Sequence, residues 1–505
     1  MRRDWVNVRM LGLLGLALVA GACGSSSKST PPPTPSSFGL LATVQLGNLP
    51  SGKPGILTSM DISWFDNFGG AENVWFTDSG NNAVDQINTA NNTFVQYINQ
   101  GKFGGNNSPT DHDCNGPNGA VTAIGPNNSF HELWVGDISG ANATNCATST
   151  PQPVVWAFDL TKSPPVPVSG FTNPVSLTCG VGGAPLISGD PSKFPTVTCP
   201  AATAAVNRGD ELSYDSKDDL ILIATPHPVP GVNPADPAAC GAATCGPWVS
   251  IVQAGTGKVL GQIIFPQADG GLEQSQWSAS TDTFYQNLPT DSDLGNDANG
   301  NEIGGVAQIK INSVSPLSVT VTVPTTATSP FSQVVSCGAT GMALLPNGNI
   351  FLGCPNSLTP NTAFPAPFPN TAGGRPANFA ELMNPSGSVI AAPFGNLAAA
   401  DEVWYDQPYN LFAGAGFNGV IGIVNAATNQ VGASVLVAPS PPAHSVTADS
   451  VNGHIIVPGP LNTDTWDNSA PLTVIPNSTQ PGNFSCTKGC VWVFGASPNN
   501  SYPVE

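Results

Sequence analysis

Residues 75–95, WFTDSGNNAVDQINTANNTFV, contain the pattern that decides the fold. A strand, a polar turn, a strand of alternating apolar and polar side chains, a second polar turn and the start of another strand follow one another. A shorter strand and turn, DISWFDN at 61–67, come just before. The Asn and Gly residues allow the tight turns that such short strands need. The stretch therefore predicts one small antiparallel sheet of four strands.

The same pattern recurs along the chain. The segments that begin the units are 61–67, 120–127, 211–219, 274–282, 341–349, 402–410 and 445–453. Each is followed by a second, apolar strand and by a third strand that is rich in Val and Ile. Four-stranded units repeated seven times predict an all-β, seven-bladed β-propeller, with six or eight blades as the alternatives.

The segment FGLLATVQL, residues 38–46, precedes the first unit and reads as a strand. We expect it to supply the outer strand of the last blade, because joining the two ends of the chain closes the ring and removes exposed sheet edges. Residues 38–505 are thus predicted to form a single propeller domain with long loops on one face.

The composition agrees with this class and excludes others. The 505 residues include 55 Gly and 50 Pro, only 9% are charged, and the net charge is −19. A coiled coil needs more charge and less Gly and Pro, and a nucleic-acid-binding protein needs a basic stripe that this chain lacks. Disorder is excluded because 40% of the residues are hydrophobic and aromatic residues occur throughout.

The N-terminus reads as an export signal. Residues 1–22 combine three Arg with the apolar run LGLLGLALVA at 11–20, which is too short to span a bilayer. Ala20-Gly21-Ala22-Cys23 then resembles a bacterial lipobox, which implies a lipid on Cys23; cleavage of an ordinary signal peptide near Ala22 is the alternative. Residues 23–37, rich in Ser and Pro, read as a tether. We expect an exported lipoprotein of the cell envelope, at the outer membrane or cell surface, held to the membrane by its anchor alone.

Ten cysteines remain besides Cys23, and an even number in an exported chain predicts disulfides. Zinc is disfavoured, since there are five His and no Cys-x-x-Cys pair. Pairing of nearest neighbours predicts Cys114–Cys146, Cys179–Cys199, Cys240–Cys245, Cys337–Cys354 and Cys486–Cys490. All ten lie in or beside loops of one face, which also receives the long insertions. Loops cross-linked by disulfides indicate either a preorganised binding face or protection against proteases.

Three short segments resemble known families. WFTDSGNNAVDQINTANNTFV (75–95) is similar to the repeat of NHL, YVTN and virginiamycin B lyase-like propellers. DEVWYD (401–406) and DELSYD (210–215) resemble the blade openings of gluconolactonase-like and YVTN propellers, with Glu in place of Gly. The resemblance implies the propeller fold, and in its gluconolactonase-like branch a catalytic metal on the channel axis.

Acidic residues stand at the starts of several first strands, which should surround the channel. These candidate metal ligands are Asp61, Glu211, Glu273 and Glu402. Carboxylates that converge from several blades suit a divalent cation such as calcium. The lyase-like resemblance implies that His444 acts as a general base there. The alternative is that the acids hydrogen-bond backbone N–H groups at the entry to each blade.

The loop DSDLGNDANGNE (291–302) is a second candidate calcium site. Its candidate ligands are Asp291, Asp293, Asp297, Asn299 and Glu302. The spacing departs from that of an EF-hand loop, because Gly295 falls where the first Asp is required. A solvated acidic loop is the alternative interpretation.

These observations favour a binding or scaffold protein, with a protein or glycan on the loop-rich face and no nucleic acid. The alternative is a metal-dependent hydrolase, acting on lactones or esters, or a lyase of the gluconolactonase-like kind. The enzyme requires a cation held on the channel axis, and the binding protein does not.

Overall fold

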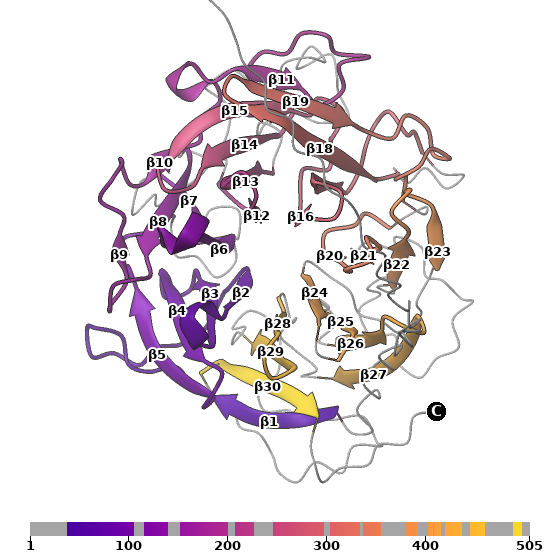
Figure 1. The fold of residues 1–505 in the computed structure, drawn as a ribbon. Coiled ribbons are helices and arrows are strands. Elements are labelled where there is room, and N and C mark those ends of the chain that lie inside the picture. The colour runs from indigo at the N-terminus through magenta and orange to yellow at the C-terminus, as the bar shows by residue number, and fades with distance from the viewer. Residues whose placement is uncertain are drawn as a thin grey trace, which may run out of the picture. The chain divides into compact units, whose positions relative to one another are not determined.

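The computed structural model describes residues 38–105, 116–139, 152–199, 208–226, 246–296, 303–333, 337–354, 379–391, 402–407, 409–415, 420–436, 445–459 and 488–496. These residues all belong to one compact unit, Pro32–Glu505. They form seven sheets that follow one another around a central axis (Figure 1). The structure therefore confirms the all-β, seven-bladed propeller.

The first four blades contain the following strands, in order from the innermost strand outward. Blade 1 contains β2 (Ser63–Asp66), β3 (Asn73–Asp78), β4 (Ala83–Asn88) and β5 (Thr93–Ile98). Blade 2 contains β6 (Ala120–Ile124), β7 (His131–Ile138) and β8 (Pro153–Asp159), and both β9 (Val166–Pro167) and β10 (Val175–Ser176) pair with β8. Blade 3 contains β12 (Leu212–Asp215), β13 (Leu220–Thr225), β14 (Trp248–Gln253), β15 (Lys258–Ile264) and β11 (Leu186–Ser188). Blade 4 contains β16 (Ser275–Ser278), β17 (Thr283–Leu288), β18 (Gly305–Val314) and β19 (Leu317–Thr322).

The remaining blades complete the ring. Blade 5 contains β20 (Met342–Leu344), β21 (Ile350–Cys354), β22 (Phe379–Met383) and β23 (Val389–Ala391). Blade 6 contains β24 (Val403–Asp406), β25 (Leu411–Ala415), β26 (Val420–Asn425) and β27 (Gln430–Leu436). Blade 7 contains β28 (Thr447–Asp449), β29 (His454–Gly459), β30 (Cys490–Ala496) and β1 (Phe38–Val44). Three short 3-10 turns, η1 (Phe68–Gly70), η3 (Pro126–Asn128) and η4 (Val181–Gly183), also occur among the described residues.

Strand β1 closes the ring, as the sequence predicted for residues 38–46. It pairs antiparallel with β30, with Val44 opposite Val491 and Thr43 opposite Trp492. The outermost strand of the last blade thus comes from the start of the propeller domain. Closure of this kind pairs an edge that would otherwise be open.

The chain between blades 2 and 3 adds two further strands. These are β10, which pairs with β8, and the parallel edge strand β11, which pairs with β15. Both are very short, so neither leaves a recognisable alternation in the sequence. In the described part of the chain, no helix has the length and apolar character needed to cross a membrane.

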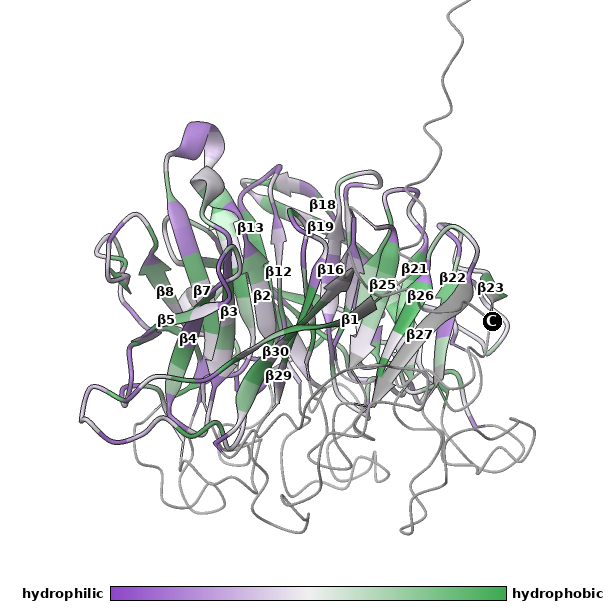
Figure 2. Ribbon diagram, turned by 90° about the horizontal axis from the view of Figure 1, so that it is seen from below, coloured by the Kyte–Doolittle hydropathy of each residue, from purple (hydrophilic) through white to green (hydrophobic). Residues whose placement is uncertain are grey.

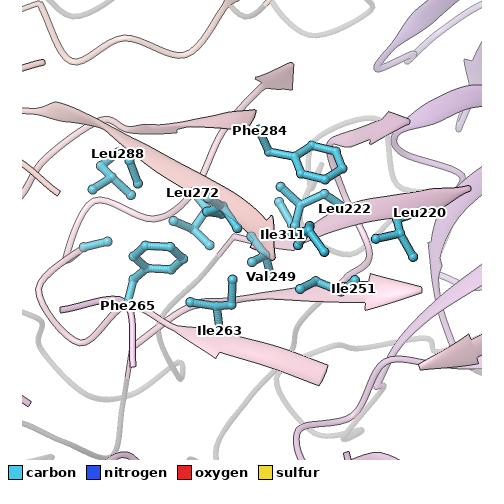
Figure 3. Packing of buried hydrophobic residues seen from close by; sticks show 14 residues of the cluster. Leu220, Leu222, Val249, Ile251, Ile263, Phe265, Leu272, Phe284, Leu288 and Ile311 are labelled. Atoms are coloured by element: carbon cyan, nitrogen blue, oxygen red, sulfur yellow. The ribbon is translucent and has the colours of Figure 1, made fainter. Parts of the chain in front are cut away.

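Neighbouring blades bury apolar side chains between them. Figure 3 shows the cluster between blades 3 and 4, in which Leu222 and Ile251 meet Phe284 and Ile311. Because each sheet is covered on both faces, middle strands such as β13 (LILIAT) are buried at every position. Apolar residues accordingly run along the strands, and polar residues gather in the turns (Figure 2).

Two of the five predicted disulfides lie within the described residues, and both are present. Cys179 is bonded to Cys199, and Cys337 is bonded to Cys354. Each disulfide involves a cysteine in a segment that connects two neighbouring blades. Each of the other three predictions, Cys114–Cys146, Cys240–Cys245 and Cys486–Cys490, involves at least one cysteine outside the described residues.

Candidate functional site

The candidate site lies at one end of the propeller axis. The strands β2, β12, β16 and β24 are the innermost of their blades and surround the centre of the ring (Figure 1). Because the blades repeat one orientation around the axis, the residues that precede these strands come to the same end of the channel. The four acids singled out in the sequence stand one or two positions before these strands: Asp61, Glu211, Glu273 and Glu402.

Glu211 is the centre of this acidic group. Its side chain is buried, with 5% exposed, and among the described residues its carboxylate has no hydrogen-bond partner. Burial raises the pKa of Glu211 well above its usual value, and the charges of Glu402, Asp210, Asp61 and Glu273 raise it further. Four carboxyl groups from four blades therefore act on Glu211. We call these four acids and Glu211 the axial acids.

Glu402 is held in a fixed orientation by a network that joins three blades. It is completely buried, and its Oε2 accepts hydrogen bonds from Trp404 Nε1 at 3.0 Å and from Gln274 Nε2 at 2.9 Å. Gln274, just before β16, in turn accepts the backbone N–H of Met342. The network places a carboxylate from blade 6 beside residues of blades 4 and 5.

Asp210 is an axial acid that sequence reasoning missed. Its Oδ2 accepts a hydrogen bond from Arg208 Nη2 at 2.9 Å, and the Arg208 side chain is only 11% exposed. The signal was present in DELSYD, where Asp210 directly precedes Glu211. A single arginine thus partly offsets the negative charge of the axial acids on one side.

Two tryptophans of innermost strands, one of which is hydrogen-bonded to an axial acid, were also missed. Trp64 on β2 and Trp404 on β24 meet edge to face, with ring centroids 4.8 Å apart and an interplanar angle of 80°. They come from blades 1 and 6, which blade 7 separates in the ring. Trp64 Nε1 donates to Thr122 Oγ1 on blade 2, while Trp404 Nε1 donates to Glu402. Both side chains are partly exposed.

The described residues do not form a preformed metal site. Within the described ranges, no group of three or more His, Cys, Asp and Glu side chains is arranged to hold a metal ion. The other axial acids act electrostatically on Glu211. Their role as ligands of the catalytic metal that the gluconolactonase-like resemblance implies stays a prediction. His444, the predicted general base, lies outside the described residues.

The second predicted calcium site is described only in part. Asp291 is buried, which raises its pKa to about 8, and its Oδ1 accepts the backbone N–H of Asp293. Asp293 forms an ion pair of 2.5 Å with Lys193. Both acids therefore have structural roles at the start of the loop, while Asp297, Asn299 and Glu302 lie outside the described residues.

Comparison with known proteins yields structural similarity alone. No family model matches the chain, and no curated protein matches its sequence. The structure of U3-55K is similar over 86% of this chain and 95% of that chain, with 8% identity and a TM-score of 0.43. The WD40 repeats of RRP9 are similar over 90% of this chain and 99% of that chain, with 8% identity and a TM-score of 0.45.

Proposed function

We propose that the protein is an exported, lipid-anchored binding protein of the cell envelope, and that the axial acids form its ligand site. The observation that carries this proposal is the position of Glu211. It is buried among four other carboxyl groups, and its own carboxyl group has no hydrogen-bond partner among the residues that the structure describes. Such an arrangement is costly in the absence of a ligand, because burial and like charges both oppose ionisation. A positively charged ligand removes both costs, which explains why the acids are kept together.

The charge of the ligand follows from the same residues. Negative side chains repel anionic polymers such as nucleic acid and attract cations, and the net charge of −19 extends this preference to the whole chain. A protein partner that presents a basic residue fits the site better than a neutral glycan does.

The N-terminal sequence supports the proposed localisation at the cell envelope. The apolar run at 11–20, the lipobox-like residues before Cys23 and the Ser/Pro-rich tether at 23–37 together suit an outer-membrane or surface lipoprotein. Expression in a bacterial host with labelled palmitate tests this directly. The chain should incorporate the label and fractionate with membranes, and the Cys23→Ser variant should do neither.

Binding at the axial acids is tested by calorimetry on the purified full chain. We expect wild-type protein to bind a cationic probe, either Ca²⁺ or a tetralysine peptide, and the Glu211→Gln/Glu402→Gln variant to lose that binding. The control is Asp137→Asn, because Asp137 is also a buried carboxyl with a raised pKa but lies on β7, a second strand. If wild type binds neither probe, or if the double variant binds as wild type does, the proposal fails.

A further inference from the structure

We propose that the group bound at the axial acids is an organic cation, an alkylammonium or guanidinium group, and that Trp64 and Trp404 form part of its site. This inference rests on the binding function proposed above and names its ligand class. It is carried by the juxtaposition of a buried acidic cluster with two partly exposed indole rings at the centre of the ring of blades.

The acids and the indoles belong to one continuous group. Trp404 Nε1 donates to Glu402 Oε2 at 3.0 Å, so the indole ring and the carboxylate are held together. The charge of Glu402 acts on Glu211, and Trp64 contacts Trp404 with a centroid separation of 4.8 Å. Glu402 thus links the two indole rings to Glu211.

This combination suits an organic cation better than a metal ion. A calcium ion requires six to eight oxygen ligands within direct contact, and the described residues contain no such preformed acidic group. An ammonium or guanidinium group needs fewer hydrogen-bond acceptors, and its charge and alkyl carbons are attracted to the face of an indole ring. Carboxylates beside aromatic rings are therefore a chemical match for lysine-like or arginine-like groups.

Glu211 supplies the free acceptor that such a ligand needs. Glu402 is already engaged by Trp404 and Gln274, and Asp210 by Arg208. Among the described residues, the Glu211 carboxylate accepts no hydrogen bond, although only 5% of the residue is exposed. We therefore assign Glu211 as the carboxylate that contacts the bound cation, with the tryptophans beside it.

The test is calorimetric titration of the purified full chain with three probes: tetralysine peptide, spermine and Ca²⁺. The variants are Glu211→Gln, Trp404→Leu and Trp404→Phe. Blade 2 offers a matched control in Trp156→Leu, because Trp156 Nε1 likewise donates to a buried carboxylate, Asp137 Oδ2, at 2.9 Å, but on strand β8 away from the axis. Thermal melting of each variant establishes that it is folded.

We expect wild type to bind at least one of the two amines, with millimolar Ca²⁺ unable to displace it. Glu211→Gln and Trp404→Leu should each weaken binding by about tenfold, Trp404→Phe should weaken it less because it keeps an aromatic face, and Trp156→Leu should leave it unchanged. Tighter binding of tetralysine would assign the group to a peptide, and tighter binding of spermine would assign it to a free amine.

The failures of this inference and of the proposed function are distinct. Binding of Ca²⁺ alone, lost in Glu211→Gln, would keep the cation-binding function and overturn the organic ligand. Amine binding that depends on Glu211 but is unchanged by Trp404→Leu would overturn the role of the indoles. Binding of no probe at all would overturn both proposals.

Discussion

Glu211 is an acid whose surroundings disfavour its charge, and this has a measurable consequence. Burial and four neighbouring carboxyl groups raise its pKa well above the usual value. A bound cation stabilises the ionised form, so its arrival should lower the pKa and release a proton. We expect tetralysine binding to release protons and to tighten as pH rises, measured by calorimetry in buffers of different ionisation enthalpy. In Glu211→Gln the release should be absent; equal release in both proteins would contradict this role.

A second pair of residues, Asp78 and Asp85, illustrates the same conflict away from the axis. Both side chains are fully buried in blade 1, and neither carboxylate oxygen of Asp85 accepts a hydrogen bond among the described residues. Burial raises the pKa of Asp78 to about 7, and burial together with the charge of Asp78 raises that of Asp85 well above the usual value. The folded state is therefore more stable when at least one of the two carboxyl groups is protonated than when both are ionised.

Asp85→Asn should stabilise the protein at alkaline pH. The amide supplies an N–H donor to Asp78 and removes a buried group whose ionisation opposes folding, so we expect the free energy of unfolding to rise by about 1–2 kcal/mol at pH 8. At pH 5 the native pair is already protonated, and the gain should be much smaller. Urea denaturation at the two pH values measures both. An equal gain at pH 5 and pH 8 would show that charge is not the cause.

Among the single elements, strand β1 closes the ring by pairing with β30. Val44 is 3% exposed and packs with Val491 and Val493 of β30, whereas Leu41 on the same strand is 37% exposed. Val44→Asp would bury an unpaired charge and should cost roughly 3 kcal/mol or more of the free energy of unfolding. Leu41→Asp is the matched control and should cost less than about 1 kcal/mol. Similar urea midpoints for the two variants would mean that closure contributes little.

The strands also show how far the sequence predicts the structure. The segment LILIATP begins with five apolar residues in succession, because a sheet covered on both sides buries both faces, and it was recognisable as a middle strand. The starts of the first strands then placed Asp61, Glu211, Glu273 and Glu402 at one end of the channel. The very short strands β9, β10 and β11 contain two or three residues, too few for any periodicity.

Contacts between distant blades could not be predicted in this way. Trp64 and Trp404 are 340 positions apart in the sequence, and their blades are not neighbours in the ring. Their side chains are in contact although blade 7 lies between the two blades. The hydrogen bond from Gln274 to Glu402 likewise joins blades 4 and 6, which blade 5 separates in the ring. A repeat pattern fixes neighbours within a blade and between adjacent blades, but not the packing of side chains around the axis.

For the whole molecule, the buried carboxyl groups predict an unusual dependence of stability on pH. Burial raises the pKa of Asp78, Asp137 and Asp406 to about 7 and that of Asp291 to about 8. In the unfolded chain an Asp has a pKa of about 3.9. Between about pH 4 and pH 7 the native state therefore binds more protons than the unfolded state, and the free energy of unfolding should fall as pH rises through this window.

The melting temperature should accordingly decline from pH 5 to pH 8, because the stabilisation is complete only below the unfolded pKa and is lost as the pH rises through the pKa values of the native carboxyl groups. General repulsion within a chain of net charge −19 acts in the same direction, and 0.5 M NaCl separates the two effects, since salt screens exposed charges far more than buried ones. We expect most of the decline to persist in salt. The Asp85→Asn variant should flatten the profile through its effect on Asp78. A melting temperature that is constant or rises from pH 5 to pH 8 in high salt would mean that these carboxyl groups are hydrated or paired in solution rather than buried as the structure has them.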